Sequence, residues 1–238
     1  PVTTEAAPQL DNAGMEQWSI SDKGTHWNLE VPASWGTMNQ LTTSSKNGTD
    51  GTTYRYVATS GTIQTDDKHS GSSAALIRTV GWGAGNTAPD AVFNRDFATC
   101  KNATAGELYL GSYNNGANYG IGFTARPAGL SFAYKYVNKN ADDRGLAIIR
   151  VKDSDGNVIA EKEAVISAMA NYSTLNISLD YNASSKKAAS LEVIFKSSNQ
   201  DVNSNRNKNW LTPPPRFDLG SGEYVGSQLY IDDIELIY

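Results

Sequence analysis

The chain has 238 residues, a net charge of −5 and a pI near 5.1, and 39% of its residues are hydrophobic. This length is enough to bury the core of one large β domain. The negative charge and the lack of a dense Lys/Arg run exclude nucleic acid as a partner. No apolar run reaches the roughly 18 residues of a membrane helix. A single cysteine, Cys100, excludes an intrachain disulfide framework and any multi-cysteine metal site.

The composition favours strands and turns over helices. Gly (21 residues) and Tyr (12 residues) are abundant, and charged residues are only 19% of the chain. Residues 1–13 are small, polar and proline-bearing, which predicts an N-terminal tail or linker. Without a further shift in composition, we expect residues 14–238 to form a single domain.

Strand patterns with alternating apolar residues recur along the chain. They cover residues 52–59, 74–80, 107–113, 130–137, 146–152, 174–181 and 191–196. The Asp155-Gly156 pair predicts a hairpin turn between two further strand segments. Only residues 88–97 and 163–170 suggest short helices. These features predict an all-β fold, an antiparallel sandwich or barrel.

Three tryptophans lie in polar, loop-like surroundings. Trp35 is in PASWGTMNQ, Trp82 is in the glycine-rich segment 81–87, and Trp210 is in a long loop predicted at 197–227. Sugar rings stack their C–H faces on indoles, while their hydroxyls bond to neutral polar groups. Each tryptophan therefore has two interpretations, an exposed sugar-binding residue or a large side chain buried in the core.

The closing segment LYIDDIELIY places Asp232 and Asp233 inside a strand pattern. An inward-facing Asp must be paired, hydrogen-bonded at the rim of the sheet, or holding a cation. The pair therefore predicts either a structural calcium site or a set of hydrogen bonds to backbone amides.

No catalytic motif stands out. Only His26 and His69 are present, and neither follows a nucleophile-elbow or zinc-ligand pattern. Glycoside hydrolysis needs just two carboxylates placed by the fold, and the sequence does not choose among Glu16, Glu30, Glu107, Glu223 and several aspartates.

Several segments, in order, resemble a family known as the carbohydrate metabolism domain, found in surface proteins of glycan-foraging gut bacteria. The resemblance covers residues 14–238 and is carried by MEQWS, SWGTMN, AGELYLGSY, GIGFTARPAGLSFAYKY, VIFKSS and LYIDDIELIY. It implies a jelly-roll β-sandwich like those of carbohydrate-binding modules, and it brings no established catalytic residues. The loop at 197–227 is longer here than in the family pattern.

Arg126, in the FTARP part of that pattern, is expected either to pair with an aspartate or to contact a ligand. By the same resemblance, Asp232 and Asp233 are the calcium candidates, and the protein is expected outside the cell or on the surface of a gram-negative bacterium, with a possible lipid anchor upstream. We expect a non-catalytic domain that binds an oligo- or polysaccharide through Trp35, Trp82, Trp210 and Arg126. The alternatives are a glycoside hydrolase or other carbohydrate-active enzyme, and a surface adhesion or scaffold module.

Overall fold

The computed structural model describes residues 6–21, 29–43, 54–57, 59–86, 102–182, 186–202, 210–212 and 223–238, and gives only the backbone for 21, 54–57 and 83–86. Cys100, His26 and the helix predicted at 88–97 lie outside these residues. Within them, no helix is long and apolar enough to cross a membrane.

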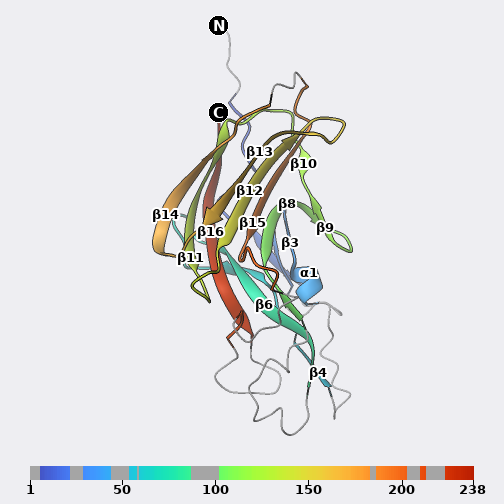
Figure 1. Ribbon diagram of the computed structural model, residues 1–238, viewed down its shortest axis with the longest axis vertical. Coiled ribbons are helices and arrows are strands. Elements are labelled where there is room, and N and C mark those ends of the chain that lie inside the picture. The colour runs from blue at the N-terminus through green and yellow to red at the C-terminus, as the bar shows by residue number, and fades with distance from the viewer. Residues whose placement is uncertain are drawn as a thin grey trace.

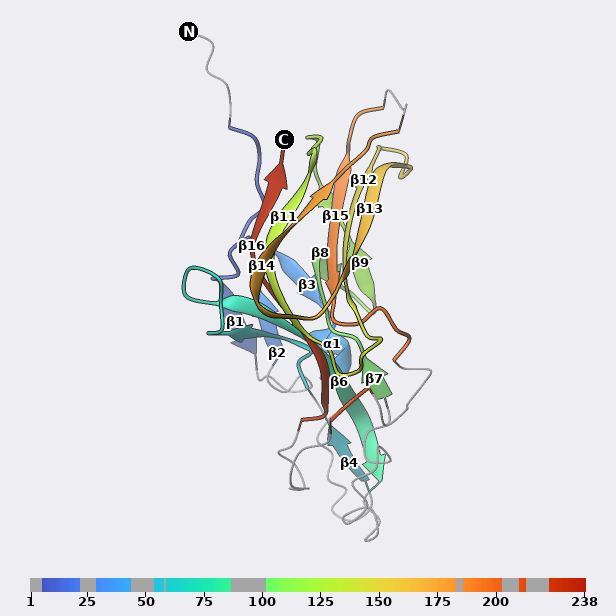
Figure 2. The same cartoon turned by 60° about the vertical axis from the view of Figure 1, so that its left-hand side comes forward.

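Two antiparallel sheets pack face to face (Figures 1 and 2), which confirms the predicted β-sandwich. The first sheet has the order β13 (Val158–Ile166), β12 (Gly145–Lys152), β15 (Ser190–Lys196), β8 (Glu107–Tyr113) and β3 (Trp35–Thr37), with β10 (Ile121–Gly122) beside β15 and β9 (Ala117–Tyr119) beside β8. The second has the order β14 (Met169–Ser178), β11 (Gly129–Val137), β16 (Val225–Ile237), β6 (Ala74–Asn86) and β4 (Tyr54–Val57), with β5 (Thr62–Thr65) and β7 (Asn102–Thr104) beside β6. A two-stranded sheet, β1 (Trp18–Ser21) with β2 (Leu29–Pro32), and one helical turn, α1 (Asn39–Thr42), complete the described elements.

The core lies between the two sheets and follows the alternation of the sequence. Each strand turns every second side chain inward, so one face of β11 packs against one face of β12 and β15. The largest buried rings meet there: Phe132 of β11 contacts Phe195 of β15 edge-to-face, with ring centroids 4.9 Å apart. The turn predicted at Asp155-Gly156 joins β12 to β13, and the Asp153 carboxylate accepts hydrogen bonds from the backbone amides of Asp155 and Asn157.

Four predictions of local structure were wrong. Residues 163–166 belong to β13 and residues 169–170 to β14 instead of a helix, and residues 81–86, predicted as a loop, extend β6. The long loop predicted at 197–227 ends earlier, because β16 begins at Val225. Residues 8–13, predicted as tail, pack on the sandwich: Leu10 is in the core, and the Gln9 side chain exchanges two hydrogen bonds with the Leu236 backbone.

The closing strand β16 contains a β-bulge at the two aspartates. Simple alternation predicts that Leu229 and Ile231 face one way and Ile234 and Leu236 the other, but all four are buried in the core. The extra residue opposite β11, with Asp233 at φ 46°, shifts the phase of the strand by one position. The bulge therefore explains how a polar pair interrupts a strand that remains apolar on its inner face.

Candidate functional site

The three tryptophans predicted as sugar-binding residues do not form one site. Trp35 is 3% exposed; its ring packs on Phe195 and its indole N–H donates to the Asp11 carbonyl at 3.0 Å. Its exposure was wrongly predicted, because β3 turns this side chain into the sandwich. Trp82 and Trp210 are half-buried, Trp82 with its indole N–H on Thr104 Oγ1, and a ligand role for them stays a prediction.

Arg126 is exposed and pairs with an aromatic ring instead of an aspartate. Its guanidinium carbon lies 4.2 Å from the ring centroid of Tyr181. The Tyr181 hydroxyl donates to the Pro127 carbonyl at 2.9 Å, which holds the ring under the guanidinium. This cation–π contact provides a structural role, and contact with a ligand stays a prediction.

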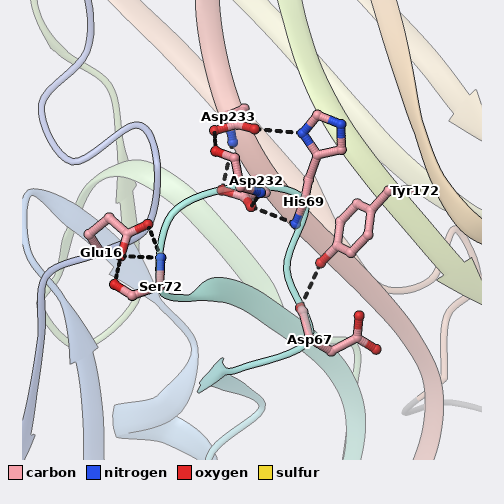
Figure 3. Close-up of polar contacts among 8 residues, drawn as sticks. Glu16, Asp67, His69, Ser72, Tyr172, Asp232 and Asp233 are labelled. Carbon is pink, nitrogen blue, oxygen red and sulfur yellow. Dashed lines mark hydrogen bonds and ion pairs between the residues drawn. The ribbon is translucent and has the colours of Figure 1, made fainter.

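Asp232 and Asp233 bind a loop of the protein itself. We call residues 66–73, between β5 and β6, the strap. Figure 3 shows the buried Asp232 carboxylate facing the strap, where it accepts hydrogen bonds from the amides of His69 (2.9 Å) and Ser70 (3.0 Å). The Asp233 carboxylate lies 2.6 Å from His69 Nδ1 and accepts the Ser70 hydroxyl at 2.7 Å.

These contacts do not fit a calcium site. Burial is the largest influence on Asp232 and raises its pKa, against the lowering effect of the amide hydrogen bonds. The neighbours of the carboxylate are backbone N–H donors of the strap, whereas calcium takes oxygen ligands. Among the described residues there is no group of three or more His, Cys, Asp or Glu that could hold a metal. Of the two predicted roles, hydrogen bonding to backbone amides at the rim of the sheet describes Asp232 and Asp233. Calcium binding stays a prediction, and the described residues offer no site for it.

The strap is attached at both of its sides. On one side the Glu16 carboxylate accepts the Ser72 amide at 2.9 and 3.1 Å, and the hydrogen bond from the Ser72 hydroxyl is the main cause that lowers the pKa of Glu16. On the other side the Tyr172 hydroxyl donates to the Asp67 carbonyl at 2.7 Å (Figure 3). Lys135, ion-paired with Asp67, lies 4.0 Å from the Tyr230 ring centroid. The strap thus covers part of the outer face of the second sheet, over β14, β11 and β16.

The outer face of the first sheet has a different character. Tyr119 of β9 is 38% exposed, and its ring stands edge-on against the fully buried ring of Tyr109, with centroids 4.9 Å apart. The Tyr119 hydroxyl donates to Glu107 Oε2 at 2.6 Å. Tyr109 in turn packs over Gly36 of β3, where an added Cβ would lie 2.4 Å from the ring. Tyr119 is therefore an exposed aromatic ring held in one orientation.

Charged side chains extend from Tyr119 across the strands. Glu107 also pairs with Lys196 Nζ at 2.8 Å. Further across, Arg150 of β12 pairs with Glu192 of β15 at 2.5 Å and with Glu161 of β13 at 2.8 Å. Lys152 forms a second ion pair with Glu192. We call this set the platform; its members are Tyr119, Glu107, Lys196, Glu192, Arg150, Lys152 and Glu161.

The ion pairs of the platform shift the titration of its members. The hydrogen bond to Glu161 is the main cause that raises the pKa of Arg150, and the same bond lowers the pKa of Glu161. Burial, reinforced by the bond to Glu107, raises the pKa of Tyr119. At neutral pH, the platform therefore presents fixed hydroxyl and guanidinium donors next to carboxylate acceptors.

Sequence reasoning missed the platform because its residues come from five strands. Glu107 was considered only as one acid among many, and Tyr119, Arg150 and Glu192 were not selected. The alternation in residues 146–152 and 191–196 does place Arg150 and Glu192 on the outer side. That they lie opposite each other depends on the β12–β15 register, which no local pattern specifies.

The fold and this face define an antiparallel β-sandwich with an aromatic and ionic outer surface. The sequence matches no family model and no curated protein. Among solved structures, it is similar to TmCBM61 in complex with β-1,4-galactotriose (TM-score 0.39, 11% identity, 96% of this chain and 96% of that one). It is also similar to a family 11 carbohydrate-binding module of the cellulosomal cellulase Lic26A-Cel5E of Clostridium thermocellum (0.34, 10%, 98% and 96%).

A third similar structure is a cyclase from Fischerella sp. TAU (TM-score 0.37, 11% identity, 97% of this chain and 96% of that one). A further match, to the tailspike protein 4 of bacteriophage CBA120, spans only 19% of that chain. Because all these TM-scores and identities are low, the fold class rests on the strand pairing described above, and the site rests on its own residues.

Proposed function

We propose that this chain binds carbohydrate without catalysis and that the platform is its binding face. The observation that carries the proposal is Tyr119, an exposed ring held by Tyr109 and Glu107. A ring fixed before binding loses little conformational entropy when a sugar stacks on it. The fixed ionic groups beside it supply donors and acceptors for sugar hydroxyls.

The ion pairs of the platform carboxylates favour binding over hydrolysis. A glycoside hydrolase needs one protonated carboxylic acid beside the bond that it cleaves, and a second carboxylate opposite. Glu107 is engaged by Lys196 and the Tyr119 hydroxyl, while Glu192 is engaged by Arg150 and Lys152. Both carboxylates are therefore held as acceptors in ion pairs. A location outside the cell or on its surface belongs to the same proposal, because polymeric glycans are met there.

Screening the purified chain on a broad glycan array tests this function, with Tyr119→Ala as the variant of the site. We expect wild type to bind at least one glycan and the variant to lose at least about ten-fold in affinity, or about 1.4 kcal/mol. Tyr172→Ala is the matched control, because it removes a half-exposed tyrosine from the opposite sheet.

Four other outcomes would overturn or replace the proposal. If the wild type binds no glycan, or if both tyrosine variants lose binding equally, the platform is not a carbohydrate site. Release of sugars from a glycan that the chain binds would identify an enzyme. Capture of a protein instead of a glycan would support the adhesion or scaffold alternative.

A further inference from the structure

Every cation of the platform already has a carboxylate of the protein as its partner. Lys196 pairs with Glu107 at 2.8 Å, and Arg150 uses both of its terminal nitrogens on Glu192 and Glu161. Lys152 shares Glu192. The three basic side chains are thus balanced by three acidic ones.

Two of those carboxylates are sheltered from water. The side chains of Glu192 and Glu107 are 5% and 11% exposed, so their ion pairs are screened less by solvent and salt than surface pairs. A uronic acid or sulfate group would have to displace one of them from its cation. The displaced carboxylate would then lie unpaired beside the incoming anion, which is costly.

Uncharged hydroxyls meet no such penalty. A hydroxyl both donates and accepts, so it can bond to the free lone pairs of a platform carboxylate while the ion pair stays intact. The net charge of −5 adds long-range repulsion of polyanions. From this charge pattern we infer that the ligand is an uncharged oligosaccharide, an inference that rests on the proposed function.

The platform also sets the size of that ligand. It spans β8, β15, β12 and β13, three strand spacings or about 14 Å in all. A single sugar stacked on Tyr119 would leave Arg150 and Glu161 unused at the other end. The inferred ligand is therefore a chain of several uncharged sugars that lies across the strands.

The test compares glycans with matched backbones and different charge. Three such pairs are hydroxyethyl- and carboxymethylcellulose, methyl-esterified and de-esterified homogalacturonan, and unsubstituted and glucuronic-acid-bearing xylan, run beside the full array. Among all glycans that bind, we expect uncharged members to bind at least about ten-fold tighter than their charged partners. Their affinity should change less than about two-fold between low and 0.5 M salt.

Matched variants locate the charge selectivity. Glu161→Gln removes the exposed partner of Arg150, so this variant should gain at least about three-fold in affinity for the carboxylated member of the pair. Glu235→Gln removes the same charge from an exposed site on the opposite sheet and should change nothing. A gain in both variants would assign the effect to overall charge and overturn a role for the platform.

The outcomes separate the inference from the proposed function. Binding only to charged glycans, or with a steep salt dependence, overturns the inference and leaves carbohydrate binding in place. Binding of a single sugar as tight as its tetrasaccharide overturns the predicted length. An absence of binding to every glycan overturns both.

Discussion

The outer faces of the two sheets hold similar residue types and use them in opposite ways. On the second sheet, Asp232, Asp233 and Tyr172 are bonded to the strap, a loop of the same chain. On the first sheet, Tyr119 and Arg150 form bonds within one layer, and no described loop is bonded across them. A polar side chain that is covered by its own chain stabilises the fold, whereas one that is ordered and left open can accept a ligand.

Among the variants that test this comparison, Asp232→Ala should have the largest effect on the stability of the fold. The change removes the carboxylate that accepts the part-buried amide hydrogen bonds of His69 and Ser70, so we expect a loss of about 3 kcal/mol in the free energy of unfolding. Urea denaturation measures it. Asp232→Asn keeps an oxygen that can accept the two amide hydrogen bonds. It also removes a buried charge that the fold disfavours, as the raised pKa of Asp232 shows. This variant should therefore lose less than half as much free energy of unfolding. A loss below about 0.5 kcal/mol in Asp232→Ala would mean that the strap is not held by this residue.

Gly36→Ala tests whether Tyr119, on the outer face of the first sheet, depends on the packing of Tyr109 over Gly36. The new methyl group would lie 2.4 Å from the Tyr109 ring, which is fully buried. Overpacking of this kind costs about 2 kcal/mol, and thermal unfolding will show it. If Tyr109 positions Tyr119, glycan affinity should also fall at temperatures where the variant is folded. Unchanged affinity in a destabilised variant would mean that Tyr109 does not position Tyr119 for binding.

Glu16→Gln gives a smaller effect that depends on pH. Hydrogen bonds from Ser72 lower the pKa of Glu16 below its ordinary value of 4.5. A carboxyl group with a lowered pKa stabilises the fold above about pH 4.5, and this contribution is lost as the pH falls through the folded-state pKa. Wild type should therefore exceed the variant in stability at pH 7, and the difference should shrink below pH 4.5. A difference that grows on acidification would contradict the assignment.

His69→Ala should have the smallest effect. The His69 ring and the Asp233 carboxylate are both partly exposed, 45% and 36%, and a polar contact this exposed contributes about 0.5 kcal/mol. The strap keeps its backbone bonds to Asp232 in this variant. Hydrogen exchange of the Ser70 amide should therefore change little, and rapid exchange would show that the imidazole matters more than the backbone contacts.

Sequence patterns predicted the strands well where one face is buried. The alternation in residues 130–137, 146–152 and 191–196 specified β11, β12 and β15 and the residues that fill the core between them. It failed where the pattern changes phase: the bulge at Asp233 and the extension of β6 through residues 81–86 both depend on pairing with a neighbouring strand. The exposure of Trp35 was also wrongly predicted, because its polar neighbours in sequence are not its neighbours in space.

By itself, the sequence determined that this chain is an all-β domain with an antiparallel core, because burial of alternate residues is a local property of each strand. It also limited the role of Asp232 and Asp233 to binding a metal ion or accepting hydrogen bonds at the rim of the sheet. Only the tertiary structure brought the strap over Asp232 and lined up Glu107, Lys196, Arg150 and Glu192 beside Tyr119. Strand order and register decide which side chains meet across a sheet, and residues far apart in the chain set both.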